Sequence, residues 1–450
     1  SWSLTRQQYG EQPFWAATAL AAMLGQMGKP GGGIAYGYTI TNYLGNNVFK
    51  MPYAPLPQKK NSIADFIPVA RVSDMLLNPG QKFDYDGKEY IYPDIDLIYW
   101  AGGNPFHHHQ NLTRLRKAWE KPSTVIVNEW CWNALARHAD IILPCTTTLE
   151  RQDIGMTPRD PFVISMDKAI EPIGEARNDY DIFAGIARNL DTEYAFTEGR
   201  SAEDWQEWIW EQSRERAAKL NVKMPDYQSF RKTGFYKSPE LNEDRIFLSD
   251  FFNDPDTNPL KTPSGKIEIF SETIDSFDYD NCPGHPTWME PAEWLGAKNK
   301  TYPLHLISNQ PRTKLHSQMD NGALSSSIKI KGHQPLEMNP VDAKARGITE
   351  GDIVKVFNGR GACLCGANIT NDVMPGVVII STGSWYDPVD PADPNSMCKH
   401  GNPNVLSPDI GTSKLGQGPA AHSCLAEIEL YEGPAQNITA FNPPEIIKKK

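Results

Sequence analysis

The sequence predicts an α/β protein with three successive regions: a parallel-sheet domain, a mixed α+β segment and a small C-terminal β-barrel. In residues 1–195, short apolar strands alternate with helical patterns. Residues 196–300 contain a Trp-rich helix followed by loops, and residues 301–435 contain short, regularly spaced strands. These changes in the predicted secondary structure indicate domain boundaries near residues 195 and 300, with residues 436–450 as a tail.

Three apolar strands in the first region predict the parallel sheet. They lie at residues 96–100, where we expect a buried strand, and at 124–127 and 140–144. Helical patterns over residues 112–119 and 133–138 separate them. A strand–helix–strand order implies parallel pairing through right-handed crossovers. The carboxyl ends of the three strands should therefore lie at one edge of the sheet.

The second region is predicted to begin with a capped helix. Ser201 precedes an acidic first turn, and a Trp-rich helix is expected over residues 205–220. Further along, residues 262–265 predict a turn that leads into a strand at residues 266–270.

Five short strands and one helix, at residues 340–346, are predicted in the last region. The Asn358-Gly359 and Arg360-Gly361 pairs supply turn residues between two of the strands. A small barrel fits this spacing better than a sandwich, although the pattern alone does not separate the two. The predicted strands are residues 304–307, 353–357, 362–369, 377–381 and 425–430.

Composition excludes several classes of function. The formal net charge of −11 argues against a nucleic-acid partner, because phosphate binding needs a basic face. No stretch approaches the about 18 apolar residues of a membrane-spanning helix, so no membrane insertion is expected. The seven cysteines form no CxxC pair, which disfavours zinc-ribbon and iron–sulfur sites. Because the sequence begins at Ser1, without Met, we expect a fragment or a processed product.

Polar residues follow each predicted strand of the parallel sheet. Residues 101–105, Ala-Gly-Gly-Asn-Pro, allow the backbone to approach a diphosphate at the start of a helix. Ligands bind at the carboxyl edge of such sheets, where a carboxylate can select guanine and Arg151 can neutralise a phosphate. The alternative is a set of ordinary helix caps. The side chains expected at this edge are Asn104, His108, Asn128, Glu129, Glu150 and Arg151.

Two later loops are further candidates. Residues 308–318 contain many hydrogen-bonding side chains, which suits a ligand such as a pterin, and the alternative is a solvated loop. Glycines in residues 400–418 allow close backbone approach to a ring or a phosphate, and the alternative is an Ω-loop at the barrel rim. The run His107-His108-His109 does not predict a metal site, because consecutive helical residues point in different directions.

Several motifs resemble those of the DMSO reductase family, molybdenum oxidoreductases that bind bis(molybdopterin guanine dinucleotide). The similarity is greatest to the trimethylamine N-oxide and biotin sulfoxide reductases. In order, the motifs are Trp-Ser-Leu-Thr-Arg at 2–6, Gly-Glu-Gln at 10–12, the Gly-rich stretch 28–33, the run 101–110, Ala-Asp-Ile-Ile-Leu-Pro at 139–144, Arg-Asn-Asp-Tyr-Asp at 177–181, Leu-His-Ser-Gln at 315–318, His-Gly-Asn-Pro-Asn-Val-Leu at 400–406 and Gly-Thr-Ser-Lys-Leu at 411–415.

The resemblance implies an identity for each region. Residues 1–195 would be a Rossmann-like domain that binds molybdopterin guanine dinucleotide. Residues 196–300 would be a mixed segment of the substrate-funnel domain, and residues 301–435 a six-stranded double-psi-type β-barrel that binds the same cofactor.

The resemblance also implies cofactor contacts. Lys314 stands where many members have Arg, which keeps the charge but loses the bidentate geometry. In this subfamily a serine upstream of these motifs ligates molybdenum, so we expect the ligand to precede Ser1 and assign no catalytic residue or metal ligand. The implied contacts are Trp2, Ser3, Arg6, Asn104, His108, Asn128, Glu129, Arg151, Asp181, Ser308, Asn309, Gln310, Pro311, Lys314, His316, Ser317, Gln318, Asn404, Ala421 and His422.

The implied activity is molybdenum-dependent reduction of small S-oxides or N-oxides by oxygen-atom transfer, with trimethylamine N-oxide, dimethyl sulfoxide and biotin sulfoxide as typical substrates. A c-type cytochrome or another redox protein would donate electrons, in anaerobic respiration in the periplasm or alternatively in the cytoplasm. The isolated fragment would be inactive. Alternatives are a molybdopterin enzyme of the formate dehydrogenase or nitrate reductase type, and a non-catalytic nucleotide-binding module.

Overall fold

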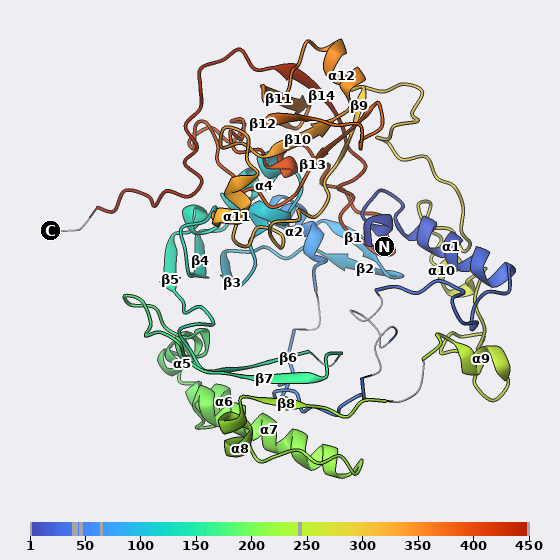
Figure 1. Ribbon diagram of the computed structural model, residues 1–450, viewed down its shortest axis with the longest axis vertical. Coiled ribbons are helices and arrows are strands. Elements are labelled where there is room, and N and C mark those ends of the chain that lie inside the picture. The colour runs from blue at the N-terminus through green and yellow to red at the C-terminus, as the bar shows by residue number, and fades with distance from the viewer. Residues whose placement is uncertain are drawn as a thin grey trace.

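The parallel sheet predicted for the first region is present as three strands in the order β3–β4–β5 (Figure 1). β3 (Leu97–Ala101) and β5 (Ile141–Pro144) flank β4 (Thr124–Glu129), and both pairings are parallel. This computed structural model describes residues 2–37, 44, 48–63, 66–157, 159–241 and 245–447.

Two details of this sheet differ from the prediction. The strand expected to be buried at residues 96–100 lies at the edge of the sheet, so Leu97 is 51% exposed whereas Val125 of the central strand is buried. The helix expected at 133–138 is only a 3-10 turn, Ala136–His138. The side chain of Asn133 accepts the Ala136 N–H at 3.0 Å, and β5 begins soon after the turn.

Ion pairs tie helix α4 (Leu112–Trp119) to helix α2 (Val72–Leu77) and to a C-terminal loop. The Arg114 guanidinium lies 2.6 Å from the carboxylate of Asp74 and 2.7 Å from that of Asp409. Arg71 contacts the same two carboxylates at 2.7 and 3.3 Å. The region also contains α1 (Glu11–Met23), β1 (Lys82–Tyr85), β2 (Lys88–Ile91) and α3 (Pro105–His108).

The last region is a closed barrel with the strand order β10–β12–β11–β14–β9–β13. All five predicted strands are present, and the hairpin between β11 and β12 closes where Asn358 pairs with Gly361. A sixth strand, β10, was not predicted, and it closes the barrel between β12 and β13. The bounds are β9 (Leu304–Ile307), α11 (Ala323–Ser327), β10 (Pro335–Met338), α12 (Pro340–Ala345), β11 (Ile353–Asn358), β12 (Gly361–Ile369), β13 (Val377–Ile380) and β14 (Leu425–Leu430).

A separate antiparallel sheet, β6–β7–β8, forms with four helices the lower part of the molecule in Figure 1. Val163, Trp210 and Phe230 belong to its hydrophobic core, and the predicted boundary at residue 195 falls between β7 and β8. The helix start expected at residues 201–204 is present, where Ser201 and Asp204 form a capping box at the start of α7. No described helix is both long and apolar enough to cross a bilayer. The bounds are β6 (Asp153–Met156), β7 (Phe162–Met166), α5 (Asp179–Asn189), α6 (Glu193–Thr197), α7 (Ala202–Ala218), α8 (Tyr227–Thr233) and β8 (Phe235–Lys237).

The strand predicted at residues 266–270 does not form. The preceding turn is present, because the Gly265 N–H donates to the Thr262 carbonyl at 3.0 Å. The segment that follows meets helix α1 instead of a strand, and the Trp15 indole N–H donates to the Glu268 carbonyl at 3.0 Å. Two short helices flank it, α9 (Ser249–Asn253) and α10 (Glu272–Asp275).

Candidate functional site

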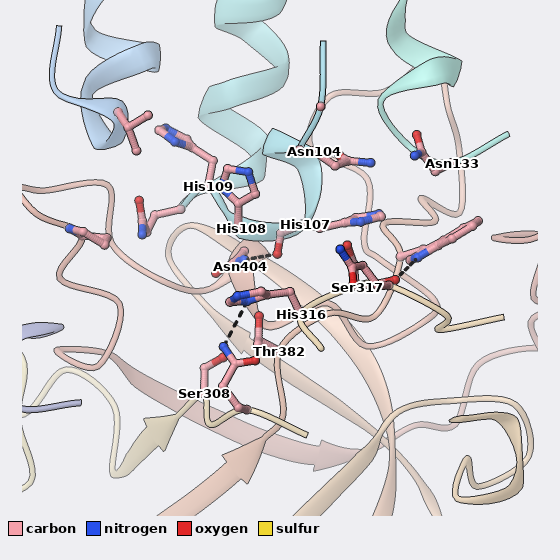
Figure 2. A pocket seen from close by; sticks show the side chains of 18 of the residues that line it. Asn104, His107, His108, His109, Asn133, Ser308, His316, Ser317, Thr382 and Asn404 are labelled. Atoms are coloured by element: carbon pink, nitrogen blue, oxygen red, sulfur yellow. Dashed lines mark hydrogen bonds between the residues drawn. The ribbon is translucent and has the colours of Figure 1, made fainter. Parts of the chain in front are cut away.

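A cavity of about 600 Å³ is lined both by the carboxyl edge of the parallel sheet and by loops of the barrel (Figure 2). Residues that follow β3 and β4 form one wall, and residues that follow β9 and β13 form the other. Thirteen of the residues expected to contact the cofactor line it: Arg6, Asn104, His108, Asn128, Glu129, Ser308, Gln310, His316, Ser317, Gln318, Asn404, Ala421 and His422.

A glycine turn opens the sheet side of the cavity. Gly102 and Gly103 have φ angles of 88° and 77°, which L side chains rarely adopt. A Cβ at Gly102 would meet no described atom within 4 Å, so the backbone there is open to a ligand. Asn104 follows and caps α3, where its Oδ1 accepts the Phe106 N–H at 3.1 Å. Its Nδ2 is buried without a partner among the described residues, and this leaves one amide donor for a ligand.

The three consecutive histidines have three different surroundings. His107 is buried and stacks on Trp385, with ring centroids 5.7 Å apart, and both of its ring nitrogens lack a partner among the described residues. Burial lowers the pKa of His107 to about 3 and that of His108 to about 4. The His109 Nε2 lies 3.0 Å from the Ser73 hydroxyl. Within the described part of the chain, no three His, Cys, Asp or Glu side chains are placed to hold a metal ion.

The end of β4 presents an amide and a carboxylate that are already hydrogen-bonded. Asn128 accepts from the Tyr99 hydroxyl at 2.9 Å and donates to the Asp179 carboxylate at 2.8 Å. Glu129 accepts from the Asn133 amide at 2.6 Å. Burial raises the pKa of Glu129, and the hydrogen bond from Asn133 opposes this shift. These bonds hold both side chains in place beside the cavity before any ligand binds.

The barrel side is formed largely by the loop after β9. Gln310 and His316 lie on this loop, and the Gln310 amide nitrogen is 3.2 Å from the His316 Nδ1 (Figure 2). The Ser317 carbonyl accepts the Trp385 indole N–H at 2.9 Å, which ties the loop to the segment after β13. His422 lies nearby, where its backbone N–H donates to the Arg6 carbonyl at 2.9 Å.

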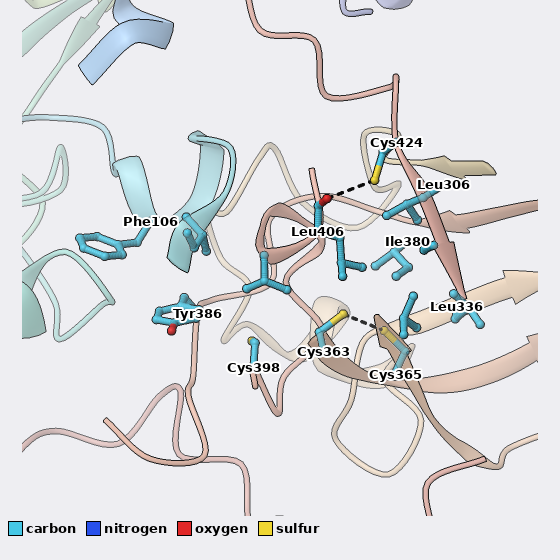
Figure 3. Close-up of a cluster of buried hydrophobic side chains, with 14 of the residues drawn as sticks. Phe106, Leu306, Leu336, Cys363, Cys365, Ile380, Tyr386, Cys398, Leu406 and Cys424 are labelled. Carbon is cyan, nitrogen blue, oxygen red and sulfur yellow. Dashed lines mark hydrogen bonds between the residues drawn. The ribbon is translucent and has the colours of Figure 1, made fainter. Parts of the chain in front are cut away.

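A hydrophobic core shared by α3, α4 and the barrel holds the two walls together (Figure 3). Phe106 of α3 is fully buried, and its ring centroid lies 6.3 Å from that of Tyr386. Above this core, Asn402 and Asn404 donate to the carbonyls of Phe106 and His107 at 3.0 and 2.9 Å. The same core buries the thiols Cys363, Cys365, Cys398 and Cys424.

Arg151 and Asp181 lie in a different cavity, of about 390 Å³, together with Glu150. The Arg151 guanidinium donates to the Thr146 carbonyl at 2.9 Å, and one carboxylate oxygen of Glu150 accepts the Ile173 N–H at 2.8 Å. All three side chains line this cavity, and the bonds of Glu150 and Arg151 also tie the surrounding loop together.

Four other described candidates do not line either cavity: Ser3, Asn309, Pro311 and Lys314. Asn309 turns towards β13 and accepts the Ser381 hydroxyl at 2.6 Å. The Lys314 side chain is completely buried and lies 2.8 Å from the Asp320 carboxylate. The Trp2 side chain lies outside the described residues.

Sequence reasoning missed several residues of the larger cavity. Thr382 and Trp385 follow β13, so the rule that polar residues gather at strand ends applied to the barrel as well as to the sheet. Asp179 begins α5 and reaches the cavity through its bond to Asn128, a contact between residues far apart in the chain. No local pattern distinguishes Asp179 from an ordinary acidic residue of a first helical turn.

Several uncharged side chains that line the larger cavity have hydrogen-bonding atoms without a partner among the described residues. In addition to Asn104 and His107, a side-chain oxygen of Gln110 and the Nδ1 of His422 are buried without a partner among the described residues. Burial lowers the pKa of His422 to about 4, so its ring is neutral at pH 7. A buried polar atom without a partner costs about 1–3 kcal/mol. The cavity therefore fits an extended ligand rich in ring nitrogens, amides and oxygens, as a pterin dinucleotide is.

Comparison with known proteins shows that the two walls of the cavity come from regions that match two known protein families. Residues 1–189 match the model of the family described as molybdopterin oxidoreductase. Residues 304–425 match the molydopterin dinucleotide binding domain. Arg6 and Asn104 lie in the first match, and His316 and His422 lie in the second.

Relatives with assigned activities match nearly the whole chain. It is 44% identical to a dimethyl sulfoxide/trimethylamine N-oxide reductase of Cereibacter sphaeroides, with 99% of this chain and 56% of the relative aligned. It is 46% identical to a biotin sulfoxide reductase of the same organism, over 97% and 58%. It is 40% identical to a trimethylamine-N-oxide reductase of Haemophilus influenzae, over 99% and 56%. The chain thus spans little more than half the length of these relatives.

A solved structure shares the fold. Acetylene hydratase from Pelobacter acetylenicus superposes with a TM-score of 0.57 over 76% of this chain and 45% of that protein. The identity is 20%, so this likeness concerns the fold alone.

Proposed function

Because this chain belongs to the molybdopterin oxidoreductase family, we propose that it holds bis(molybdopterin guanine dinucleotide) within an enzyme that reduces small S-oxides or N-oxides. Molybdenum and molybdopterin are the cofactor of this family. The bis-guanine form, the reaction and the substrates are our inference for the protein to which this chain contributes.

One observation carries the proposal. A single cavity of about 600 Å³ has walls from both matched domains, and buried polar atoms of Asn104, His107, Gln110 and His422 in it lack partners within the described chain. A ligand with heteroatoms along its whole length would satisfy these atoms. The second cavity offers the Arg151 guanidinium, whose charge suits a diphosphate or the nucleotide attached to it.

The residues of this chain would bind and orient the cofactor, which supplies the two-electron oxygen-atom chemistry when bound. Asn104 and His107 would offer hydrogen bonds at the sheet wall, and Gln310 and His316 at the barrel wall. The neutral rings of His107 and His108 allow both donor and acceptor contacts without adding charge. The metal ligand is not assigned to any residue of this chain.

The choice of substrate rests on the relatives, whose names specify dimethyl sulfoxide, trimethylamine N-oxide and biotin sulfoxide. Identities of 40–46% across nearly the entire chain support this class. We further propose that a c-type cytochrome or a similar redox protein donates electrons, and that the enzyme works in the periplasm. Fractionation of cells that produce the tagged protein would test the compartment.

The proposal is tested on the native gene product, recovered through a C-terminal tag. We expect molybdenum by mass spectrometry and about two GMP per molybdenum after acid release, because each dinucleotide arm carries one guanosine. The loaded enzyme should oxidise a reduced viologen when trimethylamine N-oxide or biotin sulfoxide is added. A folded protein with neither molybdenum nor GMP would remove the enzyme assignment and leave a nucleotide-binding module.

Arg151→Ala should reduce cofactor retention about tenfold or more in the complete protein. The reason is that a hydrogen bond to a charged group contributes about 1.5–3 kcal/mol. GMP per protein after gel filtration measures the effect. Arg214→Ala is the matched control, because Arg214 lies on α7 in an exposed pair with Glu211. Equal GMP contents in both variants would show that Arg151 does not contact the nucleotide.

A further inference from the structure

Four side chains form a buried charge cluster behind the barrel wall of the cavity: Lys314, Asp320, Lys329 and His400. Their side chains are between 0% and 4% exposed. The ammonium groups of Lys314 and Lys329 lie 2.8 and 2.9 Å from the same carboxylate oxygen of Asp320. Lys314 was expected to contact the cofactor directly, but its charge is instead directed to Asp320.

The hydrogen bonds define the charge of this cluster. The His400 Nδ1 lies 2.9 Å from the Trp385 carbonyl, which can only accept, so this nitrogen carries a proton. The Nε2 lies 2.9 Å from the Lys329 ammonium, which can only donate, so this nitrogen carries none. His400 is therefore neutral. Burial and, to a smaller extent, the Lys329 charge lower the pKa of His400 to about 3.

Asp320 is the only anion among the four residues of the cluster. Burial alone would raise its pKa, but the charges of Lys329 and Lys314 outweigh this effect and hold the pKa at about 2. Burial lowers the pKa of Lys329, but the Asp320 carboxylate 2.9 Å away opposes this shift. With both lysines protonated, two ammonium groups and one carboxylate leave one net positive charge in the cluster. A buried charge without full compensation is costly, so it is unusual in a region that serves packing alone.

Direct contacts join this cluster to the cavity wall. The second carboxylate oxygen of Asp320 accepts the Trp385 backbone N–H at 3.1 Å. Trp385 stacks on His107 and donates its indole N–H to the Ser317 carbonyl, and all three residues line the cavity. The positive charge is thus held beside the ligand space and out of contact with water, where it is weakly screened.

We propose that the buried charge cluster raises the reduction potential of the redox group bound in the cavity, because its net positive charge favours the more negative, reduced state. This inference rests on the proposed function. Asp320 and His400 contact the wall residue Trp385, and the two lysines act through Asp320, so none of the four reaches the ligand space and all are positioning residues. Their net charge acts on the bound redox group across the side chains of Trp385 and His107.

The test compares a variant that changes the net charge of the cluster with a double variant that restores this charge but loses the remaining ion pair. Lys329→Met makes the cluster neutral and keeps the pair between Lys314 and Asp320. Adding Asp320→Asn to Lys329→Met restores one positive charge while it breaks the remaining ion pair. Lys355→Met removes a partly exposed charge from β11 and is the surface control. Midpoint potentials of the molybdenum centre are measured in purified holoenzymes by redox titration followed by EPR.

We expect a lower midpoint potential in Lys329→Met, a return towards the wild-type value in the double variant, and no shift in Lys355→Met. Unchanged potentials in a loaded Lys329→Met enzyme would overturn the proposal. A double variant whose midpoint potential lies further from the wild-type value than that of Lys329→Met would also overturn it. The potential would then follow the number of lost contacts and not the net charge.

Molybdenum and GMP contents are measured in every sample. If Lys329→Met does not retain the cofactor, Lys329→Gln gives the same net charge and keeps a donor for His400, and the same shift is expected. A wild-type protein without molybdenum would contradict the proposed function itself, which is a different outcome from loaded variants with equal potentials.

Discussion

Gly383→Ala is expected to lower the free energy of unfolding by about 3–5 kcal/mol and to separate the barrel loop from the strand that supports it. Gly383 has a φ of +95°, which is strained for any residue with a Cβ. An added Cβ would lie 1.7 Å from the carbonyl oxygen of His316, so either the backbone at Gly383 or the loop over residues 308–318 must move. That loop forms the barrel wall of the cavity, so cofactor retention should fall with stability.

Urea denaturation followed by tryptophan fluorescence measures this loss, and Gly347→Ala is the matched control. Gly347 also has a positive φ, of +66°, but a Cβ there would meet no described atom within 4 Å. It should lose only about 1 kcal/mol, the conformational cost alone. Similar losses in both variants would mean that the contact with His316 is relieved without energetic cost.

Asp409→Asn is expected to lower the free energy of unfolding by about 3 kcal/mol at neutral pH. The Asp409 side chain is 2% exposed and contacts Arg71, Arg114 and, at 3.7 Å, His109. The amide keeps the shape of the side chain but leaves the Arg71 and Arg114 guanidinium groups without its charge. Helices α2 and α4 are held against the C-terminal loop by this cluster, so the docking of the sheet domain should weaken.

The effect of Asp409→Asn should depend on pH. Burial would raise the pKa of Asp409, but His109 and the two arginines outweigh it, and the pKa lies below the usual value of about 4. Because the folded state lowers the pKa, the carboxylate stabilises the protein fully above that usual value and progressively less as the pH falls below it. The difference between wild type and variant should therefore shrink in acid. Asp256→Asn, at an exposed loop position, should change stability by less than about 0.5 kcal/mol at any pH.

Local pattern was sufficient for much of the fold. Residues 304–307 and 425–430 became β9 and β14 with the predicted bounds, and in β9 the buried Leu304 and Leu306 alternate with half-buried positions, as on the two faces of a barrel wall. The alternating run at 266–270 had an equally clear pattern and formed no strand, since a ladder requires a neighbouring strand. β10 was missed because it begins with Pro335, which signals a turn as readily as a strand edge.

In the candidate site, too, some residues were predicted correctly from the sequence and others were not. Asn104 and Asn128 were placed at the cavity from topology, because the carboxyl ends of parallel strands share an edge. Lys314 was expected at the ligand because of its charge, yet the structure pairs it with Asp320, a choice that depends on how the loop folds back. Asp179 could not be predicted, since it reaches the cavity through a contact with the distant Asn128, whereas Trp385 follows the end of β13 and was open to prediction from the strand-end rule.

The order of strands in the barrel has a consequence for biosynthesis. β14, near residue 430, lies between β11 and β9, so the barrel closes only after the ribosome has made almost the whole of this chain. Asn402 and Asn404, which hold α3 against the barrel, are also translated late. The cavity therefore does not exist on the nascent chain while the sheet domain emerges. A ligand of this cavity can be enclosed only after β14 has been made, and a stop codon before β14 would yield a chain without the closed barrel.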